Sequence, residues 1–132
     1  MITNGVDIVS VDRIRRSLER SGEAFLRRVC TEQEIALMGG GNEARRAEFL
    51  AGRFAAKEAI SKALGTGFGV LGVALTDMEI LREESGAPYV VLHGKVRAVY
   101  EEKGGKNVSI SISHDGGMAV AFCTIEWKDK GD

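Results

Sequence analysis

The sequence predicts a small domain that mixes helices and strands, and three observations support this. A stretch rich in Ala and Leu, without Pro, predicts a long helix over residues 43–64. A run of β-branched residues at 5–11 predicts an N-terminal strand, and strict alternation over 107–113 predicts the first strand of a C-terminal hairpin. Because no segment has linker composition, we expect residues 1–132 to form a single domain.

The composition argues against several classes of function. The chain is 44% hydrophobic and 28% charged, which is ordinary for a soluble globular protein. It shows no signal peptide and no apolar run of membrane-spanning length, so we expect a cytoplasmic protein with no membrane partner. The net charge of −1 argues against a general nucleic-acid binder. Cys30 and Cys123 lie far apart, outside any CxxC motif, and are expected to be reduced core thiols rather than zinc ligands.

The N-terminal strand carries an aspartate in an apolar setting. Residues 5–11 read GVDIVSV, and we expect this strand to be buried on both faces. Aspartate is depleted in strands, and a buried carboxylate needs a partner. Asp7 is therefore either a structural group bonded to backbone N–H groups or an arginine, or a metal ligand.

A basic helix is expected next, from an Asp12 cap to about Ser21, with Gly22 breaking it. Ile14 and Leu18 should point inward and the arginines outward. The arginines between residues 13 and 28 are Arg13, Arg15, Arg16, Arg20, Arg27 and Arg28. Such a patch is either a solvated face or a surface that docks one acidic partner. A capping box, Thr31 to Glu34, should open a short helix.

The long helix should begin after an Asn42 cap and stop at Gly65. One stripe at helical spacing is expected to face the core, although it ends in two charged residues. Its members are Ala47, Ala51, Phe54, Glu58 and Lys62. Since burying a charge is costly, Glu58 and Lys62 are either a solvated i, i+4 pair or a functional pair.

A glycine run follows this helix, over residues 65–69. Glycines let backbone N–H groups approach an oxyanion closely. Together with Arg53, Lys57 and Lys62, the run indicates a phosphate site. The chain has neither a Walker loop nor a GxGxxG motif after a strand, so the usual nucleotide loops are excluded.

The C-terminal half should hold strands over 73–81 and 89–92 and a helix over 94–103. In the hairpin, Val108, Ile110 and Ile112 face one way and three serines the other. The turn is expected at 114–117, which places His114 in it. The last strand, 118–127, is apolar on both faces up to residue 125 and should be more completely buried.

Taken together, these polar residues favour phosphorus chemistry. Two carboxylates, Asp7 and Glu58, without Cys or His company suit a hard ion such as Mg²⁺. Lysine, arginine and backbone N–H groups can neutralise the remaining phosphate charge. Transfer at a phosphorus centre is the implied reaction.

Three segments, GVDIVSVDRI, FLAGRFAAKEAISKALGTG and VSISISH, resemble the holo-[acyl-carrier-protein] synthase family, the small bacterial 4′-phosphopantetheinyl transferases. The resemblance covers about residues 2–126. It implies an α+β fold with a long central helix packed on a mainly antiparallel sheet, and a homotrimer with active sites at subunit interfaces. It also implies Mg²⁺-dependent transfer of 4′-phosphopantetheine from coenzyme A to a serine of apo acyl carrier protein, in support of fatty acid biosynthesis.

The resemblance also assigns roles. Asp7 and Glu58 would hold Mg²⁺, Glu58 would help take the serine proton, and Lys62 would neutralise charge on the pyrophosphate. The residues expected to bind coenzyme A are Arg53, Ser61, Lys62, Gly65, Gly67, Ser113 and His114. The residues expected to dock the acidic carrier protein are Arg13, Arg16, Arg20 and Arg27.

Two other functions fit parts of the pattern. A binding module could hold an acidic protein or RNA on the arginine helix, without Mg²⁺ and without turnover. A different Mg²⁺-dependent phosphotransferase or nucleotide hydrolase would share the metal site, and would turn over ATP or another diphosphate without any carrier protein.

Overall fold

The computed structural model describes residues 1–65 and 73–129. Its elements are β1 (Ile2–Ser10), α1 (Val11–Val29), α2 (Glu32–Met38), α3 (Glu43–Leu64), a 3-10 turn (Leu75–Asp77), β2 (Met78–Arg82), β3 (Pro88–Leu92), α4 (Gly94–Glu102), β4 (Gly105–Asp115) and β5 (Met118–Trp127). One antiparallel sheet has the order β1-β5-β4, and a second pairs β2 with β3. The predicted α+β fold, a long helix on an antiparallel sheet, is confirmed.

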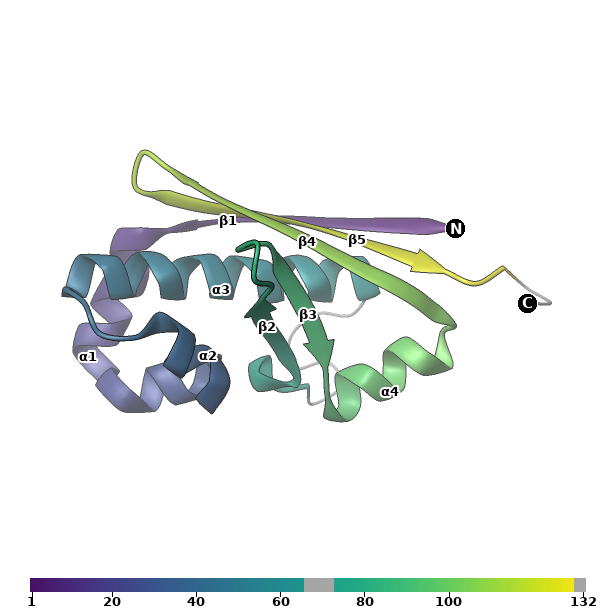
Figure 1. Ribbon diagram of the computed structural model, residues 1–132, viewed down its shortest axis with the longest axis horizontal. Coiled ribbons are helices and arrows are strands. Elements are labelled where there is room, and N and C mark those ends of the chain that lie inside the picture. Colours follow the sequence, from purple (N-terminus) through teal and green to yellow (C-terminus); the bar gives the residue numbers. More distant parts are fainter. Residues whose placement is uncertain (66–72, 130–132) are drawn as a thin grey trace.

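Helix α3 forms the middle layer of the molecule. The three-stranded sheet lies on one side, and α1, α2 and the β2-β3 sheet lie on the other (Figure 1). Its predicted ends are confirmed: Asn42 Oδ1 accepts from the Arg45 N–H at 2.9 Å, and Gly65 ends the helix with φ of 83°. Alanine is the commonest residue at its buried positions, and its small side chain lets neighbours approach from both sides.

The outer face of the three-stranded sheet is uncovered in the single chain. Val6 and Ile8 on β1 are 53% and 62% exposed, and Phe122 on β5 is 46% exposed. The expected burial of residues 5–11 on both faces is therefore wrong for the isolated chain, because no described element covers the outer face of the sheet and β1 buries only the side facing α3. Strand β5 is more completely buried than β4, as predicted, but only its alternate residues from Ala119 to Trp127 are buried, and Phe122 on its outer face is exposed.

The hairpin differs from its prediction at the turn. Strand β4 runs to Asp115, which pairs with Met118, so His114 lies in the strand rather than in the turn. Gly116 and Gly117 make the turn with φ of 56° and 77°, a backbone region that glycine adopts without strain. Alternation of the apolar and serine faces is confirmed.

Two other boundaries differ from the prediction. Within 73–81 only the end is a strand, because a 3-10 turn precedes β2. Helix α1 is capped by Ser10, whose Oγ accepts from the Arg13 N–H at 3.2 Å, and not by Asp12. It kinks at Gly22, where φ is 51°, and continues to Val29.

Cys30 and Cys123 are buried free thiols, as predicted. Burial raises the pKa of each to about 12, so both stay protonated at neutral pH. Among the residues that the structure describes, no helix combines the length and the apolar character needed to cross a membrane.

Candidate functional site

A hollow of about 640 Å³ opens where β1, α1 and α3 meet. Asp7 of β1 and Glu58 of α3 line it, and Arg13 of α1 lines it as well. Phe25 and Phe54 contribute apolar wall between these charged groups. The hollow therefore joins a pair of carboxylates to the start of the basic helix.

Lys62 lies directly against Asp7. Its ammonium donates to Asp7 Oδ1 at 3.2 Å and to the Val6 carbonyl oxygen at 2.9 Å. The Lys62 side chain remains half exposed, whereas Asp7 is largely shielded. Because Glu58 and Lys62 are one helical turn apart, α3 presents both groups to the same stretch of β1.

The environment of Glu58 raises the pKa of its carboxyl group. The largest cause is burial, followed by the negative charge of Asp7, and the nearby Lys62 ammonium opposes both. The two carboxylates therefore act on each other electrostatically. A cation placed between them would relieve this repulsion.

These residues fit a magnesium ion. Mg²⁺ is commonly held by one or two carboxylates and completed by water and substrate phosphate. Asp7 and Glu58 provide two such ligands at the wall of an open hollow, which leaves room for a phosphate. Within residues 1–65 and 73–129, no group of three or more His, Cys, Asp or Glu side chains is arranged as a metal site, so the pair would need substrate and water to complete the coordination.

The stripe that was expected to face the core instead runs from core to surface. Ala47 and Ala51 are fully buried, Phe54 and Glu58 are half-buried, and Lys62 is exposed. The reason is that the N-terminal part of the stripe is covered by neighbouring elements, whereas Phe54 and Glu58 line the hollow and Lys62 lies at the surface against Asp7.

Two of the residues predicted to bind coenzyme A are buried within the chain. Arg53 is 6% exposed; its Nη2 donates to the Ile80 carbonyl oxygen at 3.2 Å, and its guanidinium lies over the Phe49 ring. Burial lowers the pKa of Arg53, and the charge of Glu34 opposes this. Ser61 donates to the Lys57 carbonyl oxygen at 3.0 Å. Neither lines the hollow, so their binding roles stay predictions.

Ser113 and His114 lie at the other end of α3. The His114 Nε2 is 3.0 Å from the Glu48 carbonyl oxygen, ten residues before Glu58, which is about 15 Å along a helix axis. Gly52 provides the space for this ring, because a Cβ there would come within 2.9 Å of His114 Nε2. A single chain therefore does not bring Ser113 and His114 to the carboxylate pair.

The glycine run is described only at its first residue. Gly65 lines a second hollow, of about 620 Å³, together with Lys62 and Lys103. Lys103 donates to the Leu64 carbonyl oxygen at 2.8 Å and so satisfies the end of α3. Gly67 and the remainder of the run lie outside the described residues.

The arginines of α1 are exposed as predicted, but they differ in their partners. Arg16 lies 4.0 Å from Asp12, and Arg27 pairs with Glu23 and Glu32. In the described part of the chain, the side chains of Arg13 and Arg20 have no carboxylate partner. Among the four predicted docking arginines, the positive charge without a carboxylate partner in the described residues is therefore at Arg13, beside the hollow, and at Arg20.

Lys57 is not a phosphate ligand, and this prediction was wrong. Its side chain is 0% exposed, and its ammonium bonds to Glu34 on α2 and to the Val29 carbonyl oxygen. The residue that sequence reasoning missed is Glu34, which was seen only as part of a capping box. The spacing of the capping box predicts the bond of Glu34 to the Thr31 N–H. It does not predict the bond to Lys57, which lies on a different helix.

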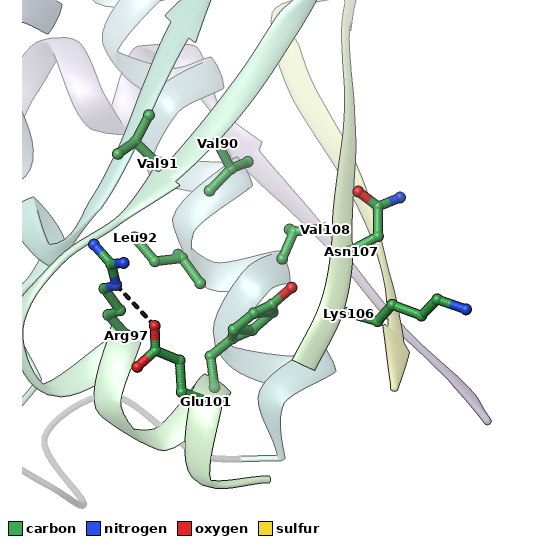
Figure 2. Close-up of a pocket in the computed structure, with 9 residues that line it drawn as sticks. Val90, Val91, Leu92, Arg97, Glu101, Lys106, Asn107 and Val108 are labelled. Atoms are coloured by element: carbon green, nitrogen blue, oxygen red, sulfur yellow. Dashed lines mark hydrogen bonds and ion pairs between the residues drawn. The ribbon is translucent and has the colours of Figure 1, made fainter. Parts of the chain in front are cut away.

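A third hollow, of about 370 Å³, lies between β3, α4 and β4 and holds none of the predicted site residues. Figure 2 shows Arg97 and Glu101 turned toward each other at its edge, with Leu92 and Val108 directed inward. Its charged groups are paired or directed away, as Lys106 is, and no carboxylate pair faces the opening.

Comparison with known proteins gives one consistent result. The 4′-phosphopantetheinyl transferase superfamily model matches residues 4–123. The chain is 42% identical to holo-[acyl-carrier-protein] synthase of Ruminiclostridium cellulolyticum, over 95% of this chain and 92% of that protein. The structure is similar to the Helicobacter pylori holo-[acyl-carrier-protein] synthase in complex with coenzyme A, with a TM-score of 0.80, 34% identity and coverage of 96% and 100%. It is also similar to the Bacillus anthracis enzyme in complex with CoA (3′,5′-ADP), with a TM-score of 0.77, 36% identity and coverage of 96% of each chain. With the carboxylate pair and its lysine in place, these matches show that the chain belongs to the 4′-phosphopantetheinyl transferase superfamily.

Proposed function

We propose that this protein transfers 4′-phosphopantetheine from coenzyme A to a serine hydroxyl of an apo acyl carrier protein, and so supports fatty acid biosynthesis. The observation that carries the proposal is a hollow lined by Asp7, Glu58 and Arg13, with Lys62 bonded to Asp7 beside it. The names of the relatives support the same reaction class, because they are holo-[acyl-carrier-protein] synthases.

In the proposed reaction, a bond forms between the serine oxygen and the phosphorus that carries the pantetheine arm. The bond from that phosphorus to the bridging oxygen breaks, and the oxygen leaves on adenosine 3′,5′-bisphosphate. Glu58, directly or through a water, would help take up the hydroxyl proton, because its carboxylate lines the hollow that the serine would enter. Lys62 neutralises charge that develops on the bridging oxygen.

Asp7 and Glu58 are the residues that would hold Mg²⁺. When bound, the ion would polarise the phosphorus centre and offset the charge of the pyrophosphate. The chain's own part is to fix the two carboxylates on different elements, β1 and α3, whose mutual position is set by close packing. The Lys62 ammonium shields Asp7 and helps hold β1 in place through the Val6 carbonyl oxygen.

The acceptor serine would approach along α1. Arg13 lines the same hollow as Glu58, so an acidic protein held on the arginines would bring its surface to the opening. Arg13 and Arg20 would contribute most, because no carboxylate of the residues that the structure describes offsets their charge, and Arg16 and Arg27 would contribute less.

The exposed apolar sheet face supports the proposal of a homotrimer. Val6 pairs with Phe122 across β1 and β5, and both side chains face outward with Ile8. An exposed patch of large apolar side chains on a sheet is a typical subunit contact. Sharing of the site between subunits would also account for the separation of His114 from Glu58 within one chain.

The test is the intact mass of a purified apo acyl carrier protein after incubation with the protein, coenzyme A and Mg²⁺. A gain of one phosphopantetheine that disappears on chelation is the expected result. Unmodified carriers, together with metal-independent binding of the carrier, would favour the binding module instead. Turnover of ATP or another diphosphate without a carrier would favour a different phosphotransferase.

A further inference from the structure

A buried lysine joins three elements directly behind the hollow. The Lys57 ammonium donates to Glu34 Oε1 at 2.7 Å and to the carbonyl oxygen of Val29, the last residue of α1. Glu34 in turn accepts from the Ile80 N–H of β2 at 3.1 Å and from the Thr31 N–H at 2.9 Å. Lys57 and Glu34 are both fully buried, so these bonds are shielded from water.

The position of Lys57 connects it to the hollow. It is adjacent in sequence to Glu58, and the α1 residue that it binds lies four positions after Phe25, which lines the hollow together with Phe54 of α3. The two carboxylates of the hollow come from β1 and α3, and the hydrogen bonds of Thr3 and Lys62 that join these two elements do not involve Lys57. The other wall of the hollow comes from α1, whose segment after the Gly22 kink is tied to α3 through the Lys57 bond to Val29.

We infer that Lys57 is a positioning residue that holds the part of α1 after the Gly22 kink, with Phe25 and Arg27, against α3 and thereby affects the docking of the carrier protein, separately from the binding of coenzyme A. This inference rests on the proposed function and deepens it. A lysine that served only the stability of the core would affect both substrates alike. A lysine that positions α1 would affect the carrier alone.

The double variant K57M/E34Q and the single variant E34Q form a matched pair. Both lack the buried ion pair, but only the single variant keeps an amine that donates to the Val29 carbonyl oxygen. The double variant removes both charges of the Lys57–Glu34 pair, and Arg53, whose Nε lies 3.9 Å from Glu34, loses that carboxylate equally in both variants, so the comparison isolates Lys57. If K57M/E34Q shows no cooperative thermal transition, K57L/E34Q replaces it in the comparison, because leucine fills the same space with a differently shaped side chain.

We expect the KM for the carrier protein to rise about fivefold to tenfold in K57M/E34Q relative to E34Q, a range typical of coupling between sites. The KM for coenzyme A and kcat should differ between the two by less than about twofold, since the carboxylate pair stays in place. Amide hydrogen exchange over residues 23–29 should be faster in the double variant alone.

Equal carrier KM values in the two variants would overturn the inference, as would a fall in kcat with no change in carrier KM. Equal exchange rates over residues 23–29 would overturn it without reference to activity. An unmodified carrier with the unsubstituted protein would instead contradict the proposed function, and the exchange comparison would still decide whether Lys57 holds α1.

Discussion

Gly5 lies so close to Ala59 that a Cβ on the glycine would come within 2.0 Å of the Ala59 carbonyl oxygen. This contact places β1 directly on the backbone of α3, and Thr3 strengthens it by donating to the Ala63 carbonyl oxygen at 2.7 Å. Because Asp7 is two residues further along the same face of β1, the missing side chain of Gly5 sets the distance of Asp7 from α3.

The first prediction concerns this contact. Gly5→Ala should push β1 away from α3, because backbone atoms of Ala59 cannot yield as a flexible side chain would. We expect a loss of about 1–3 kcal/mol in the free energy of unfolding and about 100-fold in kcat/KM from the displaced Asp7. Urea denaturation and transfer kinetics measure both. Gly40→Ala is the control for the general effect of substituting a glycine, since its Cβ would meet nothing within 4 Å and its φ is not in the left-handed region. Unchanged kcat/KM in Gly5→Ala would show that Asp7 is not held by this packing.

The second prediction concerns the carboxylate pair. Asp7→Ala and Glu58→Ala should each lower kcat by at least about 100-fold, because each removes a charge that acts on the reacting phosphate. Neither variant should unfold, since both side chains line a hollow rather than the core. Initial rates over a range of Mg²⁺ concentrations, with thermal unfolding alongside, provide the measurement. Glu102→Gln, on the exposed end of α4, is the control. Full activity in either variant would remove that residue from the site.

The third prediction concerns the basic helix. Arg13→Glu and Arg20→Glu should raise the KM for the carrier protein by roughly tenfold or more while leaving the KM for coenzyme A unchanged. Arg27→Glu should have a smaller effect, because its charge is already offset by Glu32. As the salt concentration rises, the carrier-protein KM of the unsubstituted protein should increase toward that of the variants, because salt screens the charges. If reversal at Arg13 leaves saturation by the carrier unaltered, α1 is not the docking surface.

The fourth prediction concerns the exposed sheet face. The unsubstituted protein should have a solution mass three times that of the 14.2 kDa chain. Phe122→Lys should reduce it to a single chain, because a charge at the centre of this face would be buried without a partner. Tyr89→Lys, at an exposed position in the other sheet, is the matched control and should leave the mass unchanged. Light scattering after size-exclusion chromatography decides, and a single-chain mass for the unsubstituted protein contradicts the trimer.

The fifth prediction concerns pH and the buried carboxylate of Glu79. Burial alone would raise its pKa, but hydrogen bonds from Thr31 at 2.5 Å and from His93 at 3.0 Å lower it below the ordinary value of 4.5. A carboxyl group whose pKa is lower in the folded state stabilises the fold above its ordinary pKa, and this stabilisation is lost as the pH falls through the folded value.

Glu79→Gln should therefore lower the free energy of unfolding by about 1–3 kcal/mol at neutral pH, and the difference from the unsubstituted protein should shrink below pH 4.5. Urea denaturation at a series of pH values measures this. Glu84→Gln, in the exposed turn between β2 and β3, is the control. A difference that stays constant with pH would show that the contribution of Glu79 does not come from its charge.

The sequence by itself determined the features that depend on local chemistry. The ends of α3 follow from the Asn42 cap and the Gly65 stop, and the hairpin alternation follows from the period of two in β4. The family and its reaction class were also visible, because three motifs in order are specific to it. Asp7, Glu58 and Lys62 could be named because charged side chains in apolar elements need a reason.

Only the tertiary structure decided which charges face the substrate and which are buried. Lys57 and Glu58 are neighbours on one helix, yet one is enclosed by α1 and α2 and the other lines the hollow. Spacing could not separate them, because α3 is covered on two sides and its exposed strip depends on elements distant in the sequence. The same holds for Val6 and Ile8: their apolar character predicts burial, but the outer face of the sheet is uncovered in the single chain, which leaves them exposed together with Phe122 of the central strand.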